Sequence, residues 1–219
     1  MDRMELIRAF EQVPSGNAAD ALVQLGLCAA VPDAGLHPVG IPQKRAAGYA
    51  VTVKQMTRSG NAEGSSLARH AAVIDEQLGE GDMLVIDAGG RTDVCTGGAL
   101  LALCAKLRGA SGWVINGALR DVEEIRKLDF PVHLKGGSPV KSAPLLQTVG
   151  VNIPVEIGGV QICPGDIVLT DETGIVVIPP AHAEAVLQKA LDIGRREAET
   201  ERLLREGKSF SEAKKEANL

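Results

Sequence analysis

The sequence predicts an α/β fold, a single domain over residues 1–219 with a parallel βαβ core and an antiparallel β layer. Two near-continuous apolar runs, DMLVIDAGG and GWVING, are typical of parallel strands covered on both faces. A helical stripe separates them, and after residue 150 short alternating strands and tight turns take over. A chain of 219 residues, 45% of them hydrophobic, has enough material for one large core.

The N-terminal third is predicted to contain two helices, a loop, a strand and a third helix. The charged segment MDRMELIRAFEQ is helical in character, and residues 17–26 carry apolar side chains at helical spacing after Ser15, a possible N-cap. A loop rich in Gly and Pro follows over about residues 31–47, and GYAVTVKQM alternates as a strand does. The next helix, after residue 61, presents one apolar face made of Leu67, Ala71, Ile74 and Leu78.

The centre of the chain is predicted to form a βαβαβ unit. The helix between the two apolar strands is expected to pack through Leu100, Leu103, Cys104 and Leu107, and a second helix over residues 121–129 through Val122, Ile125 and Leu128. The third strand is PVHLKG. Right-handed crossovers place these three strands parallel in one sheet, so that their carboxyl ends share an edge.

The last third is predicted to be antiparallel and then helical. VQICPGDIVLTDETGIVVIPP indicates strands joined at Pro164-Gly165 and at Thr173-Gly174. A helix from about residue 181 to residue 206 follows, so charged that pairs of opposite charge four residues apart support it. Such a helix is expected on the surface or across a neighbouring subunit.

Composition excludes several classes of function. The net charge is −5 and aromatic residues make up 2%, which leaves neither a basic stripe nor a stacking platform for nucleic acid. The four cysteines are scattered, without zinc or disulfide spacing, and this suits a reducing cytoplasm. Neither a leader nor an apolar run near the ~18 residues of a membrane span is present, so we expect a soluble cytoplasmic protein without membrane contact.

Two loops at the shared strand edge are the candidate functional site, because ligands of open parallel sheets collect there. The first is DAGGRTDVCTGG, after which the amides of Gly98, Ala99, Leu100 and Leu101 would face an anion at a helix start. The second is NGALRD. Arg120 suits a carboxylate, and Asp121 suits a hydrated Mg²⁺ or Mn²⁺. Together these groups predict a small 2-oxo acid as substrate.

Other interpretations compete with this one. An Arg-Asp pair at a helix start is more often a helix cap with a solvated arginine, and Asp87 could cap loop amides. The four histidines and Cys95 show no spacing that marks them as ligands or as a nucleophile. LVIDAGG also looks like the first motif of nucleotide-dependent methyltransferases, but the third glycine is missing and the next strand ends in Asn116-Gly117 instead of an acid.

LVIDAGG, GGALLALCAKLRG, WVINGALRDVEEIRKLDFPVHLKG and GGVQICPGDIVLTDETGIVVIPP, in this order, resemble the family named for the regulator of ribonuclease activity A (RraA). That family includes class II 4-hydroxy-4-methyl-2-oxoglutarate aldolases. The resemblance covers about residues 16–206. It implies a fold like that of swivelling phosphohistidine domains, with homotrimers or hexamers that have active sites between subunits.

The resemblance also implies roles for individual residues. Arg120 would bind the substrate carboxylate, Asp121 would ligate the metal, and the amides from Gly98 to Leu101 would bind the pyruvoyl end. The implied reaction is retro-aldol cleavage of a 4-hydroxy-2-oxo dicarboxylate to pyruvate, with oxaloacetate decarboxylation as a side activity. Ala99 stands where the aldolases carry an acid, and a second acid from the neighbouring subunit would be Glu197, or else Glu199. A non-catalytic regulator that binds a ribonuclease is the alternative that the resemblance implies.

Overall fold

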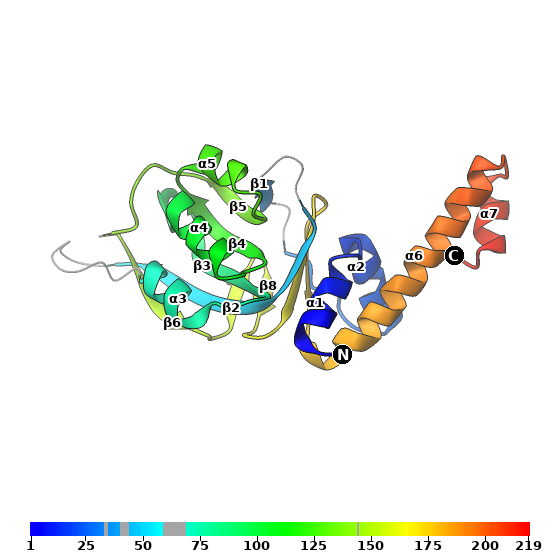
Figure 1. Ribbon diagram of the computed structural model, residues 1–219, viewed down its shortest axis with the longest axis horizontal. Helices are drawn as coiled ribbons and strands as arrows, with labels where there is room; N and C mark the ends of the chain where they lie inside the picture. Colours follow the sequence, from blue (N-terminus) through cyan, green and yellow to red (C-terminus); the bar gives the residue numbers. More distant parts are fainter. Residues whose placement is uncertain (33–34, 40–43, 59–68, 144) are drawn as a thin grey trace.

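The computed structural model describes residues 1–32, 35–39, 44–58, 69–143 and 145–219. One curled mixed sheet runs through the molecule, with helices at both ends (Figure 1). Its strand order is β1-β5-β4-β3-β2-β9-β10, with β6 also paired to β2, and β7 and β8 form a separate two-stranded sheet. The strands are β1 (His37–Val39), β2 (Ala46–Thr57), β3 (Asp82–Cys95), β4 (Gly112–Leu119), β5 (Val132–Gly137), β6 (Leu146–Val151), β7 (Val155–Ile157), β8 (Val160–Ile162), β9 (Ile167–Thr170) and β10 (Ile175–Ile178).

The predicted parallel core is confirmed, and it is one strand wider than expected. β3, β4 and β5 are parallel neighbours, as the crossover rule requires. β2 is parallel to β3 as well, with Tyr49 opposite Asp82 and Lys54 opposite Asp87. The loops that leave β2, β3, β4 and β5 therefore all begin at the same edge of the sheet.

The antiparallel strands mostly extend this sheet. β9 pairs with β2 and with β10, so these strands continue the parallel core, whereas β7 and β8 form a small sheet of their own. The predicted turn at Thr173-Gly174 does join the paired strands β9 and β10. The expectation that Pro164-Gly165 joins two paired strands was wrong, because β8 and β9 belong to different sheets.

Three helices cover one face of the parallel strands: α3 (His70–Gln77), α4 (Ala99–Leu107) and α5 (Val122–Lys127). In α5, Ile125 is fully buried, with Val122 and Leu128 packed beside it, as the sequence predicts. In α3, Val73, Ile74 and Leu78 are buried while Ala71 is exposed, and the predicted Leu67 lies outside the described residues.

The prediction of which α4 side chains face the core was wrong. Ala102 and Ala105 are the buried residues of this helix, because small side chains let it lie close to the sheet. Leu100 and Leu107 are each 78% exposed, and Leu103 is also exposed, while Cys104 packs partly against the core. The helix therefore presents leucines to its surroundings.

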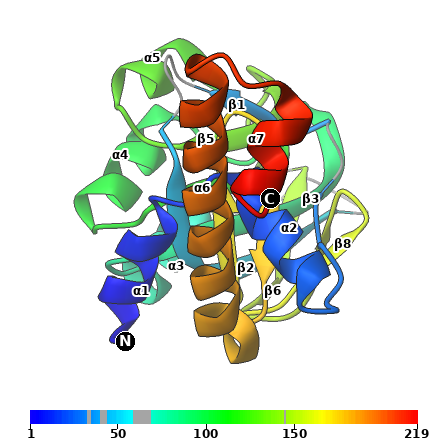
Figure 2. The ribbon, with the colours of Figure 1, turned by 90° about the vertical axis from the view of Figure 1, so that its right-hand side faces the viewer.

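Three helices pack around β9 and β10 at the far end of the molecule: α1 (Arg3–Phe10), α2 (Ser15–Gln24) and α6 (Ala183–Arg205), which follows a short 3₁₀ turn (Pro180–His182). The last helix, α7 (Phe210–Glu216), packs on α6. Figure 2 shows α6 lying across this end between α1 and α2, with α7 folded back on it. The charged C-terminal helix is thus present within two residues of its predicted bounds. None of the helices in the described part of the chain is long and apolar enough to cross a membrane.

Ser15 does not cap α2 as predicted. It is the first helical residue, after Pro14 at the N-cap position, and no side chain among the described residues caps this helix. The Ser15 amide and hydroxyl both donate to the Asp171 carboxylate, at 2.8 Å each. Asp171 also accepts from the amides of Thr173 and Gly174, so one carboxylate joins the start of α2 to the β9–β10 turn.

Candidate active site

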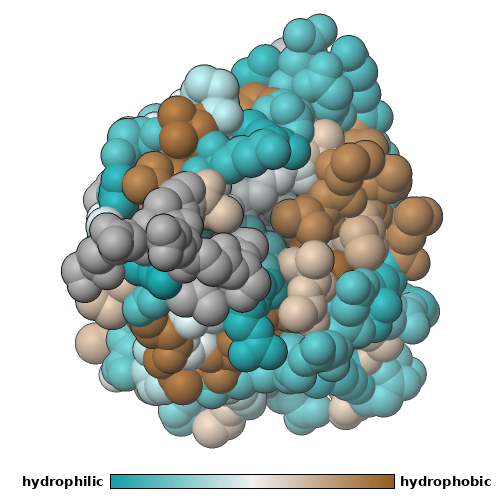
Figure 3. Space-filling model, turned by 90° about the vertical axis from the view of Figure 1, so that its left-hand side faces the viewer, coloured by the Kyte–Doolittle hydropathy of each residue, from teal (hydrophilic) through white to brown (hydrophobic). Residues whose placement is uncertain are grey.

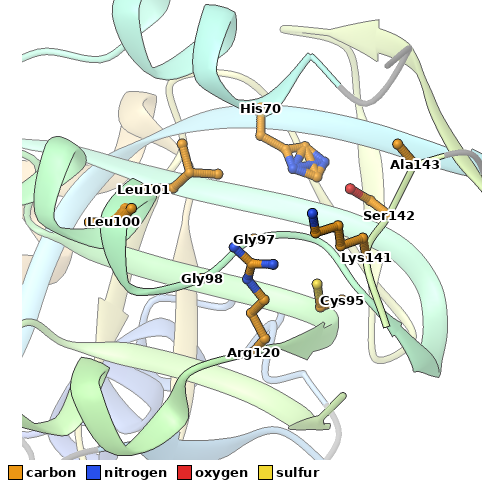
Figure 4. Close-up of a pocket in the computed structure, with 10 residues that line it drawn as sticks. All are labelled: His70, Cys95, Gly97, Gly98, Leu100, Leu101, Arg120, Lys141, Ser142 and Ala143. Atoms are coloured by element: carbon orange, nitrogen blue, oxygen red, sulfur yellow. The ribbon is translucent and has the colours of Figure 1, made fainter. Parts of the chain in front are cut away.

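The carboxyl edge of the parallel strands borders a cavity of about 240 Å³. This volume lies below the range of about 300–1,000 Å³ that is usual for drug-sized ligands, so the cavity suits a small metabolite. Figure 4 shows the lining side chains, which come from helices and a strand as well as from loops. The lining residues are His70, Cys95, Gly97, Gly98, Leu100, Leu101, Arg120, Lys141, Ser142 and Ala143.

Backbone hydrogen bonds hold the glycine loop against the end of β4. The Thr96 amide donates to the Ala118 carbonyl at 2.8 Å, and the Arg120 amide donates to the Gly97 carbonyl at 3.0 Å. The two loops that the sequence singled out are therefore neighbours, and they place Gly98 beside Arg120 in the wall of the cavity.

Gly98 stands directly before α4 as its N-cap residue. Among the described residues, none accepts from the amides of Gly98, Ala99 and Leu100. The Leu101 amide, in contrast, already donates to the Gly98 carbonyl at 3.1 Å, so three of the four predicted amides remain for an anion. The positive end of the α4 helix dipole lies at the same place and also favours the binding of an anion.

Arg120 lines this cavity, and Asp121 lies beside it, just outside the lining residues. The Arg120 Nε atom is 3.3 Å from the Asp121 Oδ2 atom, and the side chains are 39% and 43% exposed. An exposed ion pair of this kind contributes only about 0–1 kcal/mol, so a ligand can replace it at small cost. Both residues also border a second, adjoining hollow beside Gly137 and Ser138.

The backbone of Asp121 argues against a simple helix cap. Asp121 occupies the N-cap position of α5, with a left-handed φ of 55°, but its carboxylate makes no hydrogen bond to the helix amides. The carboxylate points back toward Gly98: a Cβ atom placed on residue 98 would lie 2.7 Å from Asp121 Oδ2. One carboxylate is therefore directed at the cavity rim and is not used by the helix.

Asp87 has a structural role on the other face of the sheet. Its buried carboxylate accepts from the Gly89 amide at 2.8 Å and from the Asn116 side chain at 3.0 Å, and it forms an ion pair with Lys54. The loop-capping interpretation of Asp87 is thus confirmed, and its oxygens are already occupied.

Sequence reasoning missed His70, Lys141 and Ser142. No spacing marks these residues, but each follows a parallel strand at the shared edge: His70 comes after β2, and Lys141 and Ser142 come after β5. The sheet topology is the information that could have identified these residues. With β2 recognised as a fourth parallel strand, its following segment would have been placed at the same edge.

Glu197 lies on α6, at the opposite end of the molecule from α4 (Figure 1). Its carboxylate accepts from the Asn17 side chain at 2.7 Å within the same chain. Glu197 therefore does not reach the cavity of its own chain, and its predicted role concerns a neighbouring subunit.

The sequence matches the family model described as RraA-like, Aldolase/RraA, over residues 15–177, and the chain belongs to this family. A Thermus thermophilus protein named 4-hydroxy-4-methyl-2-oxoglutarate aldolase is 35% identical over 105 residues, which cover 48% of this chain and 63% of that protein. The chain spans about three fifths of the length of such aldolase-named relatives.

Two solved structures show the same fold over nearly the whole chain. An uncharacterized protein from Pseudomonas syringae is 25% identical with a TM-score of 0.86, covering 97% of this chain and 94% of that one. Streptomyces coelicolor RraAS2, described as an unusual member of the RNase ES inhibitor RraA protein family, is 30% identical with a TM-score of 0.79, covering 90% and 96%. The predicted family and fold class are confirmed.

Proposed function

We propose that this protein is a divalent-metal-dependent lyase that cleaves a 4-hydroxy-2-oxo (di)carboxylic acid to pyruvate by retro-aldol chemistry, with oxaloacetate decarboxylation as a side activity. The observation that carries the proposal is the small cavity at which the Arg120 guanidinium and the amides before α4 meet. The names of the aldolase relatives support the same class of reaction.

Substrate binding follows from the donors of the cavity. Arg120 offers two parallel N–H donors to the substrate carboxylate. The amides of Gly98, Ala99 and Leu100 receive the negative charge that develops on the 2-oxo oxygen when the C3–C4 bond breaks. Lys141, which lines the same cavity, adds a second positive charge. The site thus binds an anion and stabilises its more negative transition state.

Asp121 is the residue that would hold the metal. No cluster of three or more ligating side chains exists among the described residues, so the protein alone does not complete a coordination sphere. One exposed carboxylate fits Mg²⁺ or Mn²⁺ that retains most of its waters. The bound ion would supply a positive charge that polarises the 2-oxo group.

The proposed assembly is a homotrimer or hexamer in the cytoplasm, in which Glu197 of a neighbouring subunit approaches the cavity. The exposed leucines of α4 support an interface beside the cavity. Figure 3 shows apolar side chains gathered on one side of the end of the molecule that carries α3 and β6. Four free cysteines, with no disulfide between them, suit a reducing compartment.

The test is pyruvate release from 4-hydroxy-4-methyl-2-oxoglutarate and from oxaloacetate, with and without Mg²⁺ or Mn²⁺. Arg120→Ala is expected to raise KM strongly, because the carboxylate loses its bidentate donor. Asp121→Ala is expected to abolish the response to added metal. Glu123→Ala, which removes an exposed carboxylate two residues further along, is the matched control and should behave as wild type. Wild-type protein that releases no pyruvate from either substrate would contradict the proposal.

A second candidate function is regulation of a ribonuclease by direct binding. The similarity to RraAS2, whose family is described as inhibitors of RNase ES, favours it. Inhibition of such a nuclease by the purified protein, unchanged by Arg120→Ala, would support this candidate. A metal-dependent lyase rate without nuclease inhibition would exclude it.

A further inference from the structure

Retro-aldol cleavage requires a base, because the proton of the 4-hydroxyl must leave before the C3–C4 bond can break. Ala99 stands where the aldolases that this sequence resembles carry an acidic residue. Ala99 has no ionisable group, and it packs against the core. None of the described residues that line the cavity has a carboxylate. The Arg120 guanidinium and the Lys141 ammonium have only donors, and a serine hydroxyl is a weak base.

His70 is the lining residue with a basic nitrogen. It opens α3, and Figure 4 shows its imidazole on the opposite side of the cavity from the Arg120 guanidinium. Burial lowers the pKa of His70 to about 4, so the imidazole is neutral at neutral pH and has a free lone pair. A side chain with these properties can accept a proton without first losing one.

The Gln55 side chain fixes the position of this imidazole. The Gln55 carboxamide contacts the His70 Nε2 atom; with its Oε1 atom accepting from Nε2–H, the ring is held through that nitrogen and keeps its lone pair on Nδ1 for the cavity. A base that is oriented by a third group is the usual arrangement in enzymes that move protons. Gln55 thus acts as a positioning residue for His70.

We propose that His70 is the catalytic base of carbon–carbon cleavage, accepting the 4-hydroxyl proton of a substrate whose carboxylate is held by Arg120. As the proton leaves, the C4–O bond becomes a carbonyl, the C3–C4 bond breaks, and its electron pair forms the enolate of pyruvate. The imidazolium then returns the proton to C3, so no proton is gained or lost overall. This inference rests on the proposed function and names the group that replaces the acid missing at Ala99.

The proposal predicts that the two reactions of this cavity differ in their need for His70. Oxaloacetate has no 4-hydroxyl, and its carbon–carbon bond breaks when an already ionised carboxylate leaves as CO₂. The resulting enolate can take its proton from water. His70 is therefore needed for aldol cleavage and is dispensable for decarboxylation, although both reactions use Arg120 and the α4 amides.

The experiment measures both activities in His70→Ala, with the metal present. Aldol cleavage is expected to fall about 100-fold or more, the usual contribution of a positioned base. Oxaloacetate decarboxylation is expected to change at most about fivefold. Added imidazole should restore part of the aldol activity by occupying the vacated space. His70→Asn, which can still bond to Gln55 but has no basic nitrogen, should show the same split if His70→Ala does not fold.

His182→Ala, at the exposed start of α6, is the control and should change neither activity. The proposal is overturned if both His70 variants retain aldol cleavage within about fivefold of wild type, or if they lose the two activities to the same extent. Wild-type protein inactive on both substrates would instead refute the proposed function itself, and the inference with it.

Discussion

Gly98 shows how a single residue without a side chain can define a site. A Cβ atom at this position would lie 2.7 Å from Asp121 Oδ2 and 2.8 Å from Arg120 Cγ, too close for either atom to remain in place. The backbone of Gly98 is extended, so the requirement for glycine comes from the neighbouring side chains and not from its own conformation. The two charged residues and the glycine before α4 therefore form one spatial unit.

Gly98→Ala is expected to displace the Arg120 and Asp121 side chains and to lower kcat/KM for pyruvate release by about tenfold or more, since a displacement near 1 Å can cost about 100-fold. Stability should change little, because both side chains are partly exposed and can move. Kinetics and thermal unfolding measure the two effects. Gly16→Ala in α2, where a Cβ atom meets nothing within 4 Å, is the control and should retain full activity. Wild-type kinetics in Gly98→Ala would show that the close contact has no catalytic importance.

At the scale of elements, α4 serves two purposes. Its alanine face lets it lie close to the sheet, which brings its N-terminal amides to the cavity, while its leucine face points outward. Leucine side chains as exposed as these are unfavourable, because burying one such side chain fully stabilises a protein by about 1.5–3 kcal/mol relative to leaving it in water. This leucine face of α4 is consequently expected to lie in the subunit interface.

Leu103→Glu combined with Leu107→Glu is expected to shift the protein from trimer or hexamer toward monomer, because two charges would be buried in the interface. Light scattering coupled to size exclusion measures the mass, which is 22.9 kDa for one chain. Val23→Glu, an exposed apolar residue on α2, should leave the assembly intact. A wild-type protein with the mass of a monomer would contradict the predicted assembly.

For the molecule as a whole, two histidines couple stability to pH. Burial lowers the pKa of His70 to about 4, and burial also lowers the pKa of the fully buried His133, whose ring contacts the Asp171 carbonyl at 3.0 Å. The folded state therefore disfavours protonation of both rings. In the unfolded chain they would take up protons near the ordinary histidine pKa of about 6.5.

The folded protein is consequently expected to lose stability as the pH falls below about 6.5, because the unfolded state binds more protons there. The stability that the two buried histidines contribute is fully present above about pH 6.5 and is lost as the pH falls toward their pKa values in the folded protein. Urea unfolding at pH 7.5 and at pH 5 measures it. His133→Asn should be less stable than wild type at pH 7.5 but should lose less stability between the two pH values. An equal pH response in wild type and variant would refute the contribution of His133.

The amino-acid sequence by itself determined the α/β class, the parallel order of β3, β4 and β5, the family, and the meeting of the glycine loop with Arg120 and Asp121. These properties follow from local patterns: apolar runs, helical spacing, and the chirality rule for crossovers. The resemblance rests on contiguous motifs, which are also local. Asp121 and Arg120 are adjacent in the chain, so their proximity needed no tertiary information.

Only the tertiary structure decided which other residues complete the cavity and which faces of the helices are buried. His70 follows β2 and Lys141 follows β5, so the two residues are far apart in the sequence. They line the same cavity because four parallel strands end at one edge of the sheet. The leucines of α4 satisfy a helical period, but periodicity does not say on which side the sheet lies, and small alanines pack there instead. Contacts between distant segments depend on the packing of the whole sheet, a property that no single stretch of the sequence contains.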